Sequence, residues 1–150
     1  HYALLKRLDQ SVAGLGDALN QLSASQETLE NIQQQLDKVG YHEDHLLREV
    51  SRDMEAKLQA LNDQAKGKRP EKQLGAWQSF ETTAYGQVSG TLWRLQGRTF
   101  EPSSQDEAEV AKAEELVKSF EQSVDAFYDT EWKNYRQQVE NAELNWFDGE

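Results

Sequence analysis

Apolar residues recur along the first forty positions with steps that alternate between three and four. Such heptad-like spacing is typical of a helix that packs one face against its neighbours. The stripe holds one polar slot and shifts once after Leu29; it consists of Leu5, Leu8, Val12, Leu15, Leu19, Leu22, Gln26, Leu29, Ile32, Leu36 and Val39. The pattern predicts a first helix from about Tyr2 to Val39, roughly 55 Å long at 1.5 Å per residue. Gly40 follows where a helix-ending glycine belongs.

Three further stripes predict helices from about His42 to Ala65, Glu71 to Gln96 and Gln105 to Ala142. The apolar positions are Leu47, Val50, Met54, Leu58 and Leu61 in the second helix, Leu74, Trp77, Phe80, Ala84, Val88, Leu92 and Leu95 in the third, and Val110, Ala113, Val117, Phe120, Val124, Phe127, Trp132, Tyr135 and Val139 in the fourth. The spacing lengthens after Phe127, so we expect the register of the fourth helix to adjust there.

The third predicted helix contains three glycines, Gly75, Gly86 and Gly90. Glycine inside a helix costs about 1 kcal/mol relative to alanine. We expect one continuous helix here, in which the glycines allow close approach of a neighbouring backbone or leave room for a large aromatic side chain. A helix that is bent or broken near Gly86 is the alternative.

The pattern of alternating polar and apolar residues that marks a strand is absent, and so is a hairpin dipeptide such as Asn-Gly. Four amphipathic helices with short connections predict antiparallel neighbours. The predicted fold is therefore an all-α, antiparallel four-helix bundle with up-down-up-down order, in which the first and last helices are longest. We expect residues 1–150 to form one domain. Because the chain begins abruptly inside a predicted helix, we also expect it to be a fragment of a longer protein.

The connection before the last helix, Gly97 to Glu109, reads GRTFEPSSQDEAE. Gly97 is expected to end the third helix, and Pro102 to keep the chain extended. Ser104 followed three residues later by Glu107 predicts a capping box at the start of the fourth helix. These local duties explain the segment as a helix end and a helix start rather than as a functional loop.

Net charge and composition exclude some classes of binding partner and some kinds of site. The net charge is −11, and residues 101–150 hold fourteen acidic against four basic residues. Nucleic acids and anionic membranes bind through lysine and arginine, so such a surface suits neither. No apolar run approaches the roughly 20 residues that cross a bilayer, so we expect no membrane insertion. There are no cysteines, which excludes disulfides and thiolate metal sites.

The sequence YHEDH, Tyr41–His45, is the strongest candidate for chemistry. His42 and His45 are three residues apart and are able to share a helical face, and imidazole with carboxylate suits zinc or iron. The spacing is not that of the His-Glu-x-x-His zinc motif. Glu43 and Asp44 also have a simpler role, since acids favour the first turn of a helix. We therefore expect no metal site and no cofactor; a metal-dependent bundle enzyme using these histidines is the third hypothesis.

The other residues do not predict a catalytic site. The chain has no Gly-x-Ser-x-Gly elbow and no phosphate-binding glycine loop. A general acid needs a desolvated carboxyl group with a raised pKa. The carboxylates of the last helix are spread evenly along it and are expected to face water; they are Glu107, Glu109, Glu114, Glu115, Glu121, Asp125, Asp129 and Glu131.

The aromatic residues divide into two groups. Phe80, Phe120 and Phe127 lie on the apolar stripes and are predicted to be core. Four others lie off the stripes or near chain ends, and we expect them to dock against another domain or protein: Trp93, Phe100, Trp146 and Phe147. Phe100 stands out because it lies on a connection and has no capping role.

The order of these segments resembles a known family. A long leucine-rich helix and a basic break are followed by YGQVSGTLWRLQG and then by EPSSQDEAEVAKAEELVKSFEQSVDAFYDTEWKNYRQQVENAELNWF. In this respect the chain is similar to the C-terminal helical region of large bacterial proteins with sortilin-like (Vps10-type) β-propellers and BNR repeats, often named as glycosyl hydrolases. In that family a small residue follows a proline before the last helix, as Ser103 follows Pro102 here.

The resemblance implies a propeller N-terminal to this chain and a periplasmic or extracellular bacterial setting. None of the family's catalytic positions fall within these residues. The leading hypothesis is thus a non-catalytic helical bundle, a structural or protein-interaction appendage whose partner is an adjacent domain of the same chain or another protein. The alternative is a coiled-coil adaptor or envelope sensor domain that self-associates.

Overall fold

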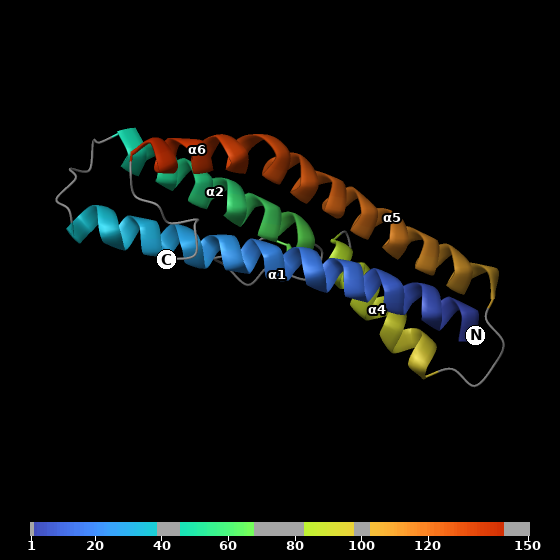
Figure 1. The fold of residues 1–150 in the computed structure, drawn as a ribbon. Helices are drawn as coiled ribbons and strands as arrows, with labels where there is room; N and C mark the ends of the chain where they lie inside the picture. The colour runs from blue at the N-terminus through green and yellow to red at the C-terminus, as the bar shows by residue number, and fades with distance from the viewer. Residues whose placement is uncertain (1, 39–45, 68–82, 98–102, 143–150) are drawn as a thin grey trace.

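The computed structural model describes residues 2–38, 46–67, 83–97 and 103–142, and all of its regular elements are helical. They are α1 (Tyr2–Lys38), α2 (Leu46–Lys66), α4 (Ala84–Gln96), α5 (Ser104–Phe127), a π-helical turn (Tyr128–Trp132) and α6 (Lys133–Asn141). The last three form one rod (Figure 1). The predicted all-α bundle is confirmed, and its first and last rods are the longest among the described residues, as the stripes indicated.

The directions of the helices differ from the predicted alternation. Arg7 bonds Glu114, and the Tyr128 hydroxyl bonds the backbone oxygen of Gln21; the separation along the chain is 107 residues in both contacts. A constant separation means that α1 and α5 run parallel, whereas up-down-up-down order would make them antiparallel. The prediction is therefore wrong for the direction of the last helix.

The reason lies in how the chain returns along α1. Gln33 of α1 bonds Glu55 of α2, and Asp37 pairs with Arg48, so α2 runs antiparallel to the second half of α1. Figure 1 shows α4 continuing in the same direction as α2, toward the N-terminal end of α1. Among the described residues, α2 and α4 thus run in the direction opposite to α1. As a result α5 starts at the end of the bundle where α1 starts.

The third predicted helix is not continuous. Thr83 has extended backbone angles, φ −94° and ψ 158°, and its side chain accepts a hydrogen bond from the Gly86 N–H at 3.0 Å. It is the N-cap of α4, because a threonine hydroxyl satisfies an N–H that has no partner within the first turn. The alternative of a break near Gly86 is closer to the structure, which places the break three residues earlier. Residues 68–82 lie outside the described part of the chain.

The predicted helix end at Gly97 is confirmed, and one helix start is corrected. Gly97 caps the end of α4. α2 ends at Lys66, and Gly67 follows it with φ 88°, the left-handed conformation that glycine favours. The capping box of α5 uses Ser103 and Asp106 rather than Ser104 and Glu107. Two adjacent serines, each three residues before an acid, look alike in sequence. The structure uses the pair whose carboxylate is buried, since Asp106 is only 6% exposed.

The buried stripe of α1 keeps most of the predicted leucines but differs from the prediction at several of the positions between them. Ala18 and Ser25 are buried where Leu19 and Gln26 were expected, and Val12 is 39% exposed. From Leu15 onward the buried positions step by three and four without the predicted shift: Leu15, Ala18, Leu22, Ser25, Leu29, Ile32 and Leu36. Small residues in this stripe leave room for the large side chains of the parallel rod.

The predicted change of register in the last helix is confirmed. The step from buried Phe127 to buried Trp132 is five residues, and it coincides with the π-helical turn Tyr128–Trp132. A π turn accommodates one more residue than an α turn, so the apolar stripe stays on the inner face. Phe120 and Phe127 are core residues, as predicted. Phe80 lies outside the described residues.

Candidate functional site

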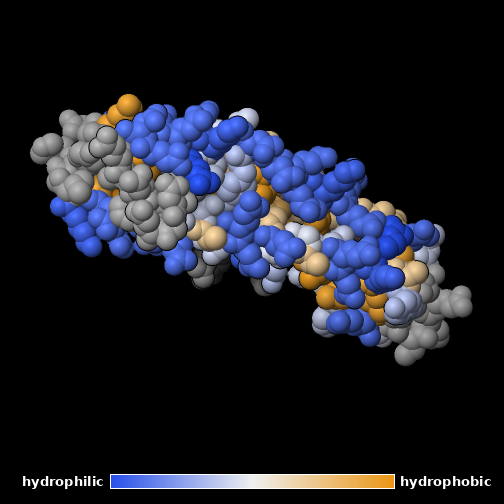
Figure 2. Space-filling view, in the orientation of Figure 1, coloured by the Kyte–Doolittle hydropathy of each residue, from blue (hydrophilic) through white to orange (hydrophobic). Residues whose placement is uncertain are grey.

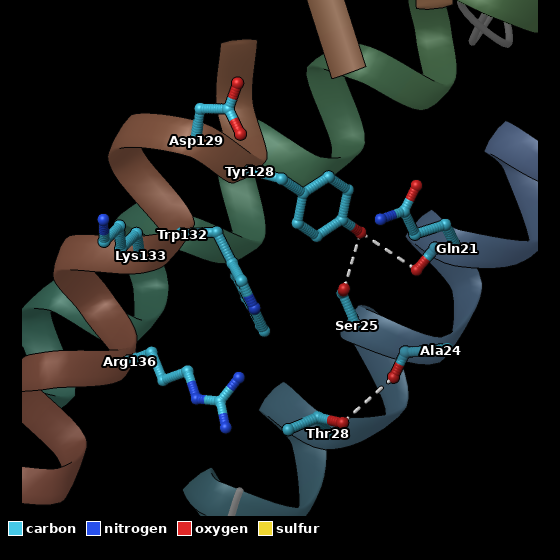
Figure 3. Close-up of a pocket in the computed structure, with 9 residues that line it drawn as sticks. All are labelled: Gln21, Ala24, Ser25, Thr28, Tyr128, Asp129, Trp132, Lys133 and Arg136. Atoms are coloured by element: carbon cyan, nitrogen blue, oxygen red, sulfur yellow. Dashed lines mark hydrogen bonds between the residues drawn. The ribbon is translucent and has the colours of Figure 1, made fainter. Parts of the chain in front are cut away.

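An open groove of about 670 Å³ lies between α1 and the π-helical turn. The name π-groove is used for it below. It is lined by Gln21, Ala24, Ser25 and Thr28 of α1 and by Tyr128, Asp129, Trp132, Lys133 and Arg136 of the last rod. Figure 3 shows the Tyr128 and Trp132 rings projecting toward α1.

Tyr128 closes one end of the π-groove. Its hydroxyl donates to the backbone oxygen of Gln21 at 2.9 Å and lies 2.6 Å from the Ser25 hydroxyl (Figure 3). Burial raises the pKa of the Tyr128 phenol, and the bond to Ser25 only partly offsets this. The phenol is therefore neutral at ordinary pH and acts as a hydrogen-bond donor, not as a base.

Trp132 forms the aromatic floor of the π-groove. Its ring centroid lies 5.4 Å from that of Tyr135, 6.0 Å from that of Phe127 and 6.1 Å from that of Tyr128. Only 9% of Trp132 is exposed. Rings at these separations and tilts support one another, so the indole is held in place.

Charged side chains stand at the rim of the π-groove. Lys133 and Arg136 are exposed and basic, and Asp129 is exposed and acidic. The Arg136 side chain also pairs with Glu140 at 3.2 Å. An aromatic floor with a mainly basic rim suits a ligand that combines an apolar ring with negative charge.

The carboxyl groups with shifted pKa values are unsuited to acid catalysis. The hydrogen bond from Arg7 lowers the pKa of Glu114, and the bond from the Gln87 side chain, with help from Arg94, lowers that of Glu109. Both groups are thus held ionised. A general acid at neutral pH needs the opposite shift.

A second surface lies on α4, at the other end of the bundle. Trp93 is 80% exposed, and beside it is a groove of about 480 Å³ lined by Gly86, Gln87, Gly90, Trp93, Arg94, Glu109 and Lys112. A Cβ added at Gly90 would meet nothing within 4 Å, so this part of the surface is open. Figure 2 shows orange, hydrophobic side chains gathered at the end of the molecule where Figure 1 places α4.

Of the residues expected to dock against a partner, Trp93 lies on the surface. Phe100, Trp146 and Phe147 lie outside the described residues, as do His42 and His45. Within the described ranges there is no cluster of three metal-ligating side chains, and no helix long and apolar enough to span a membrane. Sequence reasoning missed the π-groove, although the five-residue step from Phe127 to Trp132 is the signal that marks it.

Comparisons with known proteins give no match: no family model, curated protein or solved structure is significantly similar to this chain. The resemblance to the helical region of sortilin-like propeller proteins stays a prediction. Function is therefore argued from the surfaces described above.

Proposed function

We propose that this chain is a non-catalytic helical bundle that serves as a structural or protein-interaction appendage of a larger bacterial protein. The family resemblance suggests a parent with a β-propeller that is named as a glycosyl hydrolase, in the periplasm or outside the cell. The partner is then an adjacent domain of the parent or another protein.

The exposure of Trp93 carries the proposal. Tryptophan is enriched in the central contacts of protein interfaces, where its large ring loses water on binding. Here the ring is 80% exposed beside an open glycine surface at Gly86 and Gly90. Arg94 and Glu109 pair at 3.2 Å next to it and supply the polar edge that such interfaces have.

Footprinting of the parent protein tests the proposal. The parent and the 150-residue chain are oxidised by hydroxyl radicals, and mass spectrometry reads the oxidation of each residue. We expect Trp93 to react several-fold more slowly in the parent, because a docked ring is shielded. Leu46, which is 69% exposed at the far end of the bundle, is the internal control and should react equally in both. Equal oxidation of Trp93 in both proteins would contradict the proposal.

The Trp93→Ala variant separates docking from stability. An exposed side chain contributes little to folding, so the free energy of unfolding of the isolated chain should change by less than about 0.5 kcal/mol. Glycoside turnover by the isolated chain, lost on changing one of its carboxylates, would overturn the non-catalytic assignment. Asp-box repeats encoded before His1 would support the proposed parent.

Self-association is the second candidate function, and the same α4 surface favours it. Gly86 and Gly90 are four residues apart, a spacing that lets a second helix approach closely. Sedimentation equilibrium at tens of micromolar distinguishes the two. A dimer that Trp93→Ala dissociates supports self-association, whereas a monomer at these concentrations favours the appendage.

A further inference from the structure

The π-groove has the chemistry to bind an acidic, aromatic segment, and the chain supplies one directly after its last described residue. Residues 143–150 read ELNWFDGE, with three acidic side chains, no basic ones and two adjacent aromatics. The groove offers the Trp132 ring with Lys133 and Arg136 at its rim. We propose that residues 143–150 fold back along α6 and dock in the π-groove through Trp146 and Phe147.

The length of the segment fits this path. Ala142 is ten residues beyond Trp132, or about 15 Å along the helix axis. Four extended residues, from Ala142 to Trp146, span at most about 13–14 Å, and five, to Phe147, at most about 16–18 Å. Trp146 is therefore able to reach the level of Arg136, and Phe147 that of Trp132, when the segment runs back antiparallel to α6.

Two other grooves fit less well. The α4 groove is also partly basic, but Lys112 lies about 45 Å from Ala142 along the rod, beyond the reach of eight residues. A smaller groove of about 290 Å³, lined by Leu46, Leu47, Gln138, Asn141 and Ala142, is nearer. It has less than half the volume of the π-groove and no basic side chain among these lining residues, so it offers the acids no counter-charge.

Engineered disulfides test the docking in the full chain. The protein has no cysteine, so a pair introduced by substitution reports one contact. Ala24→Cys with Gly149→Cys joins the π-groove to the segment and spares both aromatics. Leu46→Cys with Gly149→Cys is the matched control, since Leu46 lies in the smaller groove close to Ala142. Disulfide formation is followed in a glutathione buffer by non-reducing gels and mass spectrometry, and circular dichroism in reducing buffer confirms that each variant is folded.

We expect the Ala24 pair to form an intramolecular disulfide faster than the Leu46 pair. Adding Trp146→Ala and Phe147→Ala should slow the Ala24 pair by about tenfold or more, because an anchoring ring contributes at least that factor to an equilibrium. Lys133→Glu with Arg136→Glu should slow it as well. A segment without a fixed site gives similar rates for both pairs and no effect of the aromatics, which would overturn the proposal. Disulfides between two chains would also overturn it, in favour of docking on a second copy.

Discussion

At the scale of single residues, the core is held together by two tyrosines as well as by leucines. The Tyr135 hydroxyl lies 2.7 Å from that of Ser51, which is fully buried and donates to the Leu47 backbone oxygen. Tyr128 makes the equivalent contact with Ser25 on the other side of the rod. Each pair fixes the position of the last rod relative to one neighbour, because a hydrogen bond between hydroxyls has a narrow geometry.

Replacement of Tyr135 by phenylalanine should lower the free energy of unfolding by about 1 kcal/mol. The hydroxyl is lost but the ring remains, and Ser51 keeps its bond to Leu47. Urea unfolding of both proteins at pH 7 measures the difference. Tyr2→Phe is the control, because Tyr2 is 78% exposed and its substitution should have a smaller effect. An equal loss in both variants would contradict the role of the buried pair.

The same tyrosine makes stability depend on alkaline pH. Burial raises the pKa of Tyr135 to about 12, against 10.0 for an ordinary tyrosine. Between these values the folded chain keeps a proton that the unfolded chain has lost, so stability is full below pH 10 and falls as the pH rises. The slope reaches at most about 1.4 kcal/mol per pH unit. The Tyr135→Phe variant should lack this part of the decline. Urea unfolding at pH 9 and pH 11 measures it: the free energy of unfolding should fall less between these pH values in the variant than in the unchanged protein.

At the scale of elements, two local interruptions determine the shape of the bundle. Thr83 is the N-cap at which α4 begins, and the π-helical turn Tyr128–Trp132 adds one residue to the last rod. α4, which begins at the first interruption, runs in the same direction as α2 (Figure 1). The second keeps Trp132, Tyr135 and Val139 on the inner face and opens the π-groove beside it.

Deletion of Thr130 should preserve the fold. It removes one exposed residue from the π turn, so an ordinary α-helix then carries the downstream stripe on the same face. The melting temperature should stay the same or rise, while the π-groove narrows. Deletion of exposed Gln122, in the regular part of α5, is the control; it turns every later residue by about 100° and should destabilise the bundle severely. Equal damage from both deletions would contradict the assignment of the extra residue.

The start of α4 is open to a similar test. Thr83→Ala removes the oxygen that accepts from the Gly86 N–H, and it should cost about 1 kcal/mol of the free energy of unfolding. Thr83→Ser keeps the acceptor and should retain most of the stability. Chemical unfolding of the unchanged protein and the two variants measures the free energy of unfolding. A serine variant that is as unstable as the alanine variant would argue against the cap.

At the scale of the whole molecule, the parallel course of α1 and α5 is the distinctive feature. Arg7 and Glu114 pair at 2.6 Å near the start of both helices, and a Cβ added at Gly14 would come within 3.1 Å of the Glu121 side chain. Both contacts join positions 107 residues apart. The two long rods therefore lie in one register from Arg7 and Glu114 to Gln21 and Tyr128, with α2 and α4 against them in turn (Figure 1).

Spin-label distances test this course. Labels at Gln10→Cys and Lys118→Cys should lie side by side in the parallel arrangement. Labels at Gln10→Cys and Lys133→Cys should be separated by about 24 Å along the axis. All three positions are exposed, and the chain has no other cysteine. Double electron–electron resonance measures both pairs; a longer distance for the first pair would restore the antiparallel order.

The sequence by itself determined the all-α class, most helix ends and the register change after Phe127. These follow from local rules: apolar spacing, glycine and proline at helix ends, and a capping hydroxyl near a carboxylate. The approximate boundaries and the core positions of the last rod agree with the structure for this reason. Trp93 lies on the surface because it is off its stripe.

Only the tertiary structure decided the directions of the helices, the choice between neighbouring positions such as Ala18 and Leu19 in α1, and the π-groove. Burial of either Leu19 or Ala18 fits an apolar stripe whose positions are three and four residues apart. Which of the two is buried depends on the helix that packs against α1 at that level. The parallel order follows from the direction of α4, which runs the same way as α2 (Figure 1). Local periodicity shows that a helix has an inner face. It does not specify which helix covers that face or in which direction, because those choices depend on contacts between residues far apart in the chain.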